Sequence, residues 1–430
     1  TGAVITTDHI TTTIHDDGTG SLPNGGTPDD DRPAVASVSS PTIGEGGNLD
    51  FQVTLTHPST SATPITLKLG SGATATPGVA TPGVDTDAPQ VSFDGGKSFN
   101  PITVDAQGNA QINVPANTPV DQIVVRVPTL TDNISEVAET FKLTASTPVN
   151  ATPVEGTGTI TDTTGQPTLS ISGPVDVNEA AGTITYTVTL SNPSSTPVTV
   201  GYGTVDGSAQ LGKDFTATAG TLTFAPNELS KTITVAITND GTFEGAESFQ
   251  VQLSNATGAV ITTDHITTTI HDDGTGSLPN GGTPDDDRPA VASVSSPTIG
   301  EGGNLDFQVT LTHPSTSATP ITLKLGSGAT ATPGVATPGV DTDAPQVSFD
   351  GGKSFNPITV DAQGNAQINV PANTPVDQIV VRVPTLTDNI SEVAETFKLT
   401  ASTPVNATPV EGTGTITDTT GQPTLSISGP

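Results

Sequence analysis

Acidic residues recur at matching places in two stretches of this chain that otherwise differ widely in sequence. The first stretch carries GEGGN (44–48), GVD (83–85), TDNISEVAETF (131–141) and ITD (160–162), and the second carries NEAAGT (178–183), GKDF (212–215), NDGTFEGAESF (239–249) and IHDDG (270–274). Ca²⁺ takes about six to eight oxygen ligands, so a site needs carboxylates that converge from several loops. Two carboxylates about 4 Å apart repel by roughly 4 kcal/mol at an effective dielectric near 20, so such clusters need a cation. The pattern favours cation sites, and surface charge that keeps a long array soluble is the alternative.

The elements that position these loops are predicted to be β-strands. Apolar and polar residues alternate in the segments 49–55, 123–127, 184–190, 233–237 and 249–253, a pattern typical of strands with one buried face. Gly and Pro, 46 and 37 residues respectively, interrupt the chain at short intervals. The sequence therefore predicts an all-β protein built from sandwiches.

The chain repeats itself, because residues 1–174 reappear letter for letter as residues 257–430. Verbatim repetition suits a fibre or stalk, which gains length from every unit, better than it suits a catalytic site. The boundaries predict the last strand of a truncated B-type module (1–17), a Gly/Pro/Asp linker (18–31), a first A module (32–164), a B module (166–273), a linker (274–287), a second A module (288–420) and the first strand of a truncated B-type module (422–430). With no Met in the chain, we expect a window cut from a longer array that includes neither a signal peptide nor a secretion signal.

Composition excludes several classes of partner. Lys and Arg total 12 against 44 Asp and Glu, which gives a formal net charge of −32 and disfavours binding to nucleic acid and anionic membranes. No apolar run approaches the length needed to insert directly into a membrane. The absence of Cys excludes disulfides and thiolate metal sites. Aromatic residues make up only 3% of the chain, with no Trp, and several small cores suit that composition better than one large core.

Other motifs carry less chemistry. The six histidines (His9, His15, His57, His265, His271 and His313) accompany no nucleophile signature, so we do not expect an enzyme. The PDDD runs at 28–31 and 284–287 favour disordered acidic spacers, with cation binding at the linker as the alternative.

The acidic motifs also carry a family resemblance. The B module resembles a Calx-beta domain along its full length, because its four acidic motifs, TLTF (221–224) and LSN (253–255) occur in that family's order. The A modules are similar to the variant of this sandwich in large secreted bacterial adhesins of the RTX, biofilm-forming kind, with DGG (94–96) and VPA (114–116) as part of the pattern. The resemblance implies tandem immunoglobulin-like (Calx-beta-type) β-sandwich modules in an elongated array, with Ca²⁺ bound in loops at one end of each module.

The resemblance also implies a set of Ca²⁺ ligands. In the B module these are Glu179, Asp214, Asp240, Glu244, Glu247, Asp272 and Asp273. In the first A module they are Glu45, Asp85, Asp132, Glu136, Glu139 and Asp162, and in the second they are Glu301, Asp341, Asp388, Glu392, Glu395 and Asp418. The A modules carry fewer consecutive aspartates than the family pattern, and we expect fewer ions in them.

Three functions are consistent with these observations. The leading expectation is a Ca²⁺-stabilised stalk (extender) region of a bacterial cell-surface adhesin, which projects a distal binding domain for attachment or biofilm formation. Its partners would be neighbouring repeats of the same chain. A self-associating extracellular filament is the first alternative, and other copies of the chain would then be partners. A Ca²⁺-sensing Calx-beta module is the second.

Overall fold

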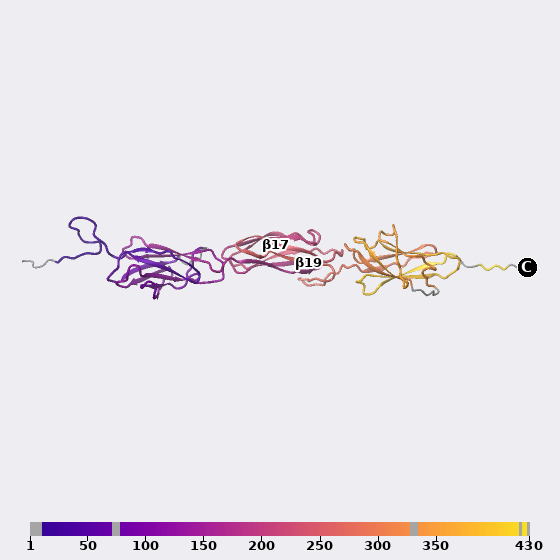
Figure 1. Cartoon of the computed structure of the whole chain (residues 1–430), viewed down its shortest axis with the longest axis horizontal. Coiled ribbons are helices and arrows are strands. Elements are labelled where there is room, and N and C mark those ends of the chain that lie inside the picture. Colours follow the sequence, from indigo (N-terminus) through magenta and orange to yellow (C-terminus); the bar gives the residue numbers. More distant parts are fainter. Residues whose placement is uncertain (1–10, 71–77, 327–333, 421–423, 428–430) are drawn as a thin grey trace, which may run out of the picture.

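The structure is a computed structural model that describes residues 11–70, 78–326, 334–420 and 424–427. Within these residues the regular structure is β-strand apart from one 3₁₀ turn, η1 (Glu179–Ala181). Figure 1 shows three elongated sandwiches arranged end to end in one row, in chain order. The prediction of all-β tandem sandwich modules is therefore confirmed. None of the described residues form a helix long and apolar enough to cross a membrane.

Each A module is built from two five-stranded sheets. In the first A module one sheet has the order β1–β3–β8–β5–β6 and the other β2–β10–β9–β4–β7. Their bounds are β1 (Val35–Val38), β2 (Thr42–Gly44), β3 (Asn48–Leu55), β4 (Thr63–Leu69), β5 (Gln90–Ser92), β6 (Asn100–Pro101), β7 (Asn109–Val114), β8 (Ile123–Pro128), β9 (Glu139–Ser146) and β10 (Val154–Thr161).

The second A module repeats this topology, with sheets β20–β22–β27–β24–β25 and β21–β29–β28–β23–β26. Its strands are β20 (Val291–Val294), β21 (Thr298–Gly300), β22 (Asn304–Leu311), β23 (Thr319–Leu325), β24 (Gln346–Ser348), β25 (Asn356–Pro357), β26 (Asn365–Val370), β27 (Ile379–Pro384), β28 (Glu395–Ser402) and β29 (Val410–Thr417).

The B module pairs a four-stranded sheet, β16–β13–β11–β18, with a five-stranded sheet, β12–β19–β17–β14–β15. Its strands are β11 (Thr168–Ser172), β12 (Asp176–Asn178), β13 (Thr183–Leu190), β14 (Val198–Asp206), β15 (Ala219–Phe224), β16 (Ser230–Ala236), β17 (Glu247–Thr257), β18 (Val260–Thr263) and β19 (His265–His271). The strands β17 and β19, labelled in Figure 1, run side by side along the module.

The cores follow from the alternation in the strands. In β3 the buried residues are Leu49, Phe51, Val53 and Leu55, at every second position, and in β13 they are Ile184, Tyr186, Val188 and Leu190. Each module has its own cluster of buried apolar side chains, as expected from the shortage of large aromatics. Val124 departs from the alternation and is buried beside Val125. It pairs with Gln52 on one side and Ser92 on the other, in a strand that is central in its sheet.

Both terminal segments lie partly outside the described residues. Of the predicted strand at 1–17, residues 11–17 are described and form only a bridge between Asp17 and Asp30. Of the predicted strand at 422–430, residues 424–427 are described and form no strand. In the B module the equivalent segments are β19, which pairs with β17 and β12, and β11, which pairs with β13 and β18. The terminal segments lack those partner strands within the described residues.

The linker at 274–287 differs from the predicted disordered spacer. Leu278 packs against the apolar core of the B module, and Asp287 is only 3% exposed. The backbone of Ser277 bridges to Val177, next to the end of β12. Since Gly276 has a φ of +85° and a β-carbon there would lie 2.5 Å from the backbone of Val177, only glycine permits this close approach. The linker therefore packs in an ordered way against the end of the B module.

Successive modules are joined by equivalent backbone bridges. At the first junction, Ser135 donates its N–H to Pro193 at 2.8 Å and accepts from Ser195 at 2.9 Å. At the second junction, Phe243 donates to Pro314 and accepts from Thr316, both at 2.9 Å. In each case the loop before β9 or β17 contacts a Pro-Ser loop of the next module. The loops before β9 and β17 also carry predicted Ca²⁺ ligands.

Candidate metal centres

The topology brings the acidic loops of the B module to one end of the sandwich. Strands β12 and β19 are parallel, with Asn178 opposite His271, so Glu179 and Asp272 leave the sheet side by side. The antiparallel strand β17 begins at Glu247, opposite Ile270. Asp214 lies in the loop between β14 and β15, and β14 ends beside the start of β17. Four separate segments thus deliver carboxylates to the same end.

The B-module carboxylates form two clusters. Asp214, Glu244 and Glu247 make one, which we call the loop cluster, and Glu179, Asp272 and Asp287 make the other, the junction cluster. In each cluster the three side chains can place one oxygen apiece within 4.8 Å of one another. The two remaining predicted ligands, Asp240 and Asp273, belong to neither cluster. Asp287 was not in the predicted ligand set, although cation binding at the PDDD run 284–287 was the alternative to a disordered spacer.

The two predicted ligands outside the clusters have local partners instead. Asp240 donates its backbone N–H to Glu179 at 3.3 Å and accepts one from Thr242 at 2.7 Å. The Asp273 carboxylate accepts the backbone N–H of Thr275 at 3.1 Å and also its hydroxyl. These hydrogen bonds hold the pKa of Asp273 below its usual range. Asp240 still contributes charge near Glu179 and Asp272.

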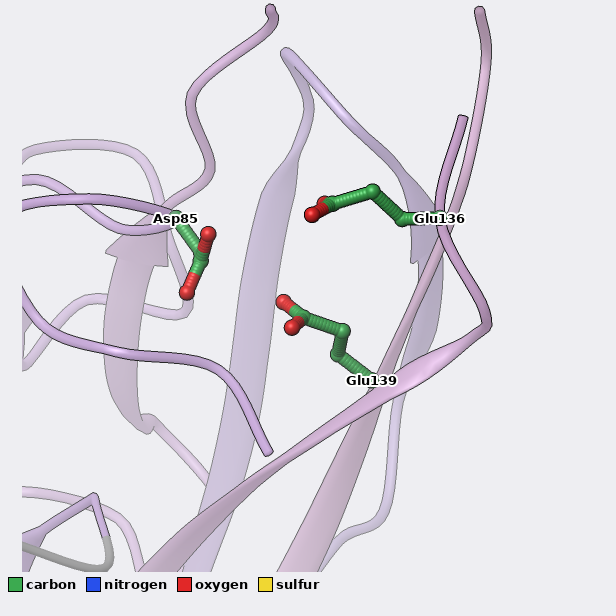
Figure 2. Close-up of side chains that lie close together, drawn as sticks. All are labelled: Asp85, Glu136 and Glu139. Carbon is green, nitrogen blue, oxygen red and sulfur yellow. The ribbon is translucent and has the colours of Figure 1, made fainter. Parts of the chain in front are cut away.

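In the A modules the equivalent of the loop cluster is present. Asp85, Glu136 and Glu139 form it in the first copy, and Asp341, Glu392 and Glu395 form it in the second. Figure 2 shows the three carboxylates of the first copy directed toward one another across an open space. Glu136 is held by its backbone N–H, which donates to Asp162 at 3.0 Å. In the second copy Glu301 and Asp388 line the same small pocket as the cluster.

The other predicted A-module ligands surround the cluster without joining it. Asp132 accepts the backbone N–H of Ile134 at 2.7 Å, and Asp162 accepts that of Thr164 at 2.7 Å. Glu45 accepts the hydroxyl of Thr163 at 3.4 Å. In the second copy, Asp418 likewise accepts the backbone N–H of Thr420 at 2.7 Å. Within the described residues the A modules have no equivalent of the junction cluster; that they bind fewer ions stays a prediction.

Crowding of carboxylates shifts their acidity. Burial, followed by the charges of Asp272 and Asp287, raises the pKa of Glu179 to about 8. Burial is also the main cause that raises the pKa of Asp272 to about 7 and that of Glu247 to about 7. In the first A module, burial and the nearby aspartates raise the pKa of both Glu136 and Glu139 to about 7. Without a cation, ionisation of these carboxylates therefore destabilises the folded protein.

The donor set fits Ca²⁺. Each cluster offers only carboxylate oxygens, which are the ligands that hard cations take, and includes no His. Three carboxylate oxygens at these sites are buried with no hydrogen-bond donor, namely Oδ1 of Asp272, Oδ2 of Asp287 and Oε2 of Glu301. A buried carboxylate oxygen without a partner is strongly unfavourable unless a cation meets it. A bound Ca²⁺ would supply the missing positive charge.

These acidities predict how the stability of the metal-free chain depends on pH. A group whose folded pKa is raised contributes stability that is complete below its unfolded pKa, near 4.5 for Glu, and lost as the pH rises through the folded pKa. For Glu179, Glu139 and Glu247 that window runs from about 4.5 to between 7 and 8. We expect the metal-free chain to melt at a higher temperature at pH 5 than at pH 8, measured by calorimetry in metal-depleted buffer. A melting temperature that rises steadily from pH 5 to pH 8 would contradict the raised pKa values of the cluster carboxylates.

Fold and sites together define a class of protein: tandem β-sandwich modules whose end loops gather clusters of carboxylates with the donor set of a divalent-cation site. The Calx-beta domain family matches this chain at residues 110–165, 162–274 and 366–421, together just over half of its length. The chain therefore belongs to the Calx-beta domain family. The match covers the whole B module and the second part of each A module.

Two similar proteins come from animals. The chain is 41% identical over 78 residues to sodium/calcium exchanger 1 of the dog, Canis lupus familiaris, across 18% of this chain and 8% of the exchanger. It is 33% identical over 197 residues to extracellular matrix protein 3 of the sea urchin Lytechinus variegatus, across 40% of this chain and 6% of that protein. The chain thus matches less than a tenth of the length of either relative.

Solved structures of the same domain type are also similar. The apo form of the Calx CBD1 domain is 28% identical, with a TM-score of 0.25, and the alignment covers 25% of this chain and 99% of that domain. The calcium-binding domain CBD12 of CALX1.1 is 20% identical, with a TM-score of 0.25, over 54% of this chain and 79% of that structure.

Proposed function

We propose that these modules are a Ca²⁺-stabilised structural repeat, the extender region of a large cell-surface adhesin that holds a distal binding domain away from a bacterial cell. The observation that carries the proposal is that acidic loops also make the backbone contacts between successive modules, which lie in one row (Figure 1). Ser135 and Phe243, which make the backbone bridges to the next module, directly precede the cluster residues Glu136 and Glu244. The role is non-catalytic.

The mechanism follows from this adjacency. In the absence of a cation, repulsion between the carboxylates favours conformations in which the loops before β9 and β17 move apart. A bound Ca²⁺ fixes Glu136 or Glu244 and with it the neighbouring residue that bridges to the next module. Ion binding in one module would thereby restrict bending at the junction. Extracellular Ca²⁺, in the millimolar range, would keep the row straight.

An extracellular location agrees with two features. The similarity to a sea urchin protein named for the extracellular matrix covers 40% of the chain. Extracellular modules bind Ca²⁺ with dissociation constants of about 10⁻⁴–10⁻³ M, which suits clusters of only three carboxylates.

Small-angle X-ray scattering of the full chain tests the proposal. In Ca²⁺ we expect rod-like scattering with a long maximum dimension, and in chelator or Mg²⁺ a smaller radius of gyration because the junctions bend. Glu244→Gln should reduce the effect of Ca²⁺, whereas Glu155→Gln, an exposed partner of Lys142, should leave it unchanged. Scattering curves that superpose in Ca²⁺ and chelator would contradict the extender role, and polymers formed on Ca²⁺ addition would favour a filament.

A Ca²⁺-sensing module is the second candidate, favoured by the 41% identity to the exchanger over 78 residues. A sensor must respond at dissociation constants of about 10⁻⁷–10⁻⁵ M, well below those of extracellular modules. Titration of the full chain with Ca²⁺ separates the two roles. Half-saturation near 10⁻³ M supports the extender, and half-saturation below about 10⁻⁵ M supports the sensor.

A further inference from the structure

Asp287 lies at the junction between the B module and the second A module. It follows the linker and precedes β20 of the second A module, yet its side chain belongs to the junction cluster of the B module with Glu179 and Asp272. Its backbone N–H donates to the carbonyl of Asp272 at 3.2 Å. On the other side, Oδ1 of Asp287 lies 3.3 Å from Nε2 of His313, in the second A module.

Hydrogen bonds from one side chain of the B module hold the linker and thereby position Asp287. The buried side chain of Asn178 donates to the carbonyls of His271, Thr275 and Asp285 at 2.9–3.2 Å. Its Oδ1 accepts the backbone N–H of Asp285 at 2.8 Å. One amide at the end of β12 therefore fixes both the start of the linker and its end, two residues before Asp287. The cost of ordering this long loop points to a defined role for its last residue.

The junction cluster contains buried carboxylate oxygens that accept no hydrogen bond. Asp272 and Asp287 are 2% and 3% exposed, and each has one buried oxygen, Oδ1 and Oδ2 respectively, without a hydrogen-bond donor. These oxygens belong to carboxylates that meet Glu179, which is itself buried, within 4.8 Å. Within the described residues no hydrogen-bond donor reaches these two oxygens, whereas a divalent cation would bind to all three carboxylates.

The chain contains its own comparison for this arrangement. Asp31 has the same sequence surroundings as Asp287, and its neighbours make the same contacts, including the Asp30–Arg32 ion pair at 2.7 Å that matches Asp286–Arg288. However, no B-module body precedes Asp31 within the described residues. The side chain of Asp31 is 46% exposed, against 4% for Asp287. Burial of the aspartate thus requires the B module.

We propose that Asp287, at the end of the linker, completes a Ca²⁺ site at the junction between the B module and the second A module, so that the ion fastens this junction. The site rests on the proposed Ca²⁺ function and extends it, because its third carboxylate comes from outside the domain that supplies the other two. The first junction, after the first A module, has no such site in the described residues and relies on the backbone bridge at Ser135. The two kinds of junction would therefore differ in their response to Ca²⁺.

The test compares Asp287→Asn with Asp31→Asn in the full chain, using calorimetric Ca²⁺ titration and thermal melts. We expect Asp287→Asn to weaken one class of site by at least about tenfold and to lower the melting temperature in Ca²⁺. In metal-free buffer the same variant should melt no lower than the parent, because one repelling charge is gone. Asp31→Asn should match the parent in every condition.

Other outcomes would overturn the proposal. If Asp287→Asn retains the parent's number of sites and affinities, Asp287 is not a ligand. If it melts lower in metal-free buffer and leaves Ca²⁺ binding intact, its role is structural only. A parent chain that binds no Ca²⁺ would reject the proposed function itself, a result distinct from loss of a single site.

Discussion

Replacing Phe249 by alanine is expected to destabilise the B module by about 3–5 kcal/mol, the usual cost of truncating a buried Phe. Phe249 is fully buried and stacks on Phe215, with ring centroids 4.4 Å apart and an interplanar angle of 18°. Phe215 directly follows Asp214, and Phe249 lies two residues after Glu247. The ring pair therefore anchors both loops of the loop cluster. Unfolding in denaturant with excess Ca²⁺ measures the loss of stability, and Ca²⁺ titration of the folded, metal-depleted variant measures the loss of affinity.

Phe224→Ala is the matched control, because Phe224 is fully buried in the same core but does not adjoin a cluster residue. We expect a similar loss of stability from both variants and a loss of Ca²⁺ affinity at the loop cluster only from Phe249→Ala. Equal Ca²⁺ affinities in the two variants would show that the ring pair does not position the carboxylates.

Local patterns in the sequence were sufficient to predict the sandwiches. The alternation in segments such as 49–55 and 184–190 corresponds to strands β3 and β13 with one buried face. The acidic motifs also lie where the register of neighbouring strands brings them together, as with Glu179 and Asp272 at the ends of β12 and β19. Such features depend on residues close in sequence or on a pairing that the period of two dictates.

The details of the sites depend on long-range contacts and could not be predicted. Asp287 is placed by Asn178, whose amide contacts Asp285 across 107 residues, and the PDDD run alone favours a solvated spacer. Asp273 looks equivalent to Asp272, but Thr275 binds its carboxylate and removes it from the cluster. The sequence signal for Asp287 was the PDDD run itself, for which cation binding at the linker was the alternative. The glycine at 276, which permits the linker to lie against β12, is a second signal.

Removal of Ca²⁺ is expected to lower the melting temperature of the chain substantially. Ligand at 100 times its dissociation constant stabilises the folded state by about 2.7 kcal/mol per site. Since about 1 kcal/mol shifts the melting temperature of a domain near 100 residues by roughly 4–8 °C, one site corresponds to roughly 10–20 °C. The B module, with two clusters, should respond more than the A modules, with one each.

Differential scanning calorimetry of the full chain in about 10 mM Ca²⁺, about 10–100 times the dissociation constants of about 10⁻⁴–10⁻³ M expected for extracellular sites, tests the central claim most directly. Parallel scans in chelator and in the same concentration of Mg²⁺ provide the controls. We predict a Ca²⁺-specific rise, largest for the transition that Phe249→Ala identifies as the B module. Superposed melts in Ca²⁺, Mg²⁺ and chelator would contradict it, because the acidic loops would then carry surface charge rather than bound ions.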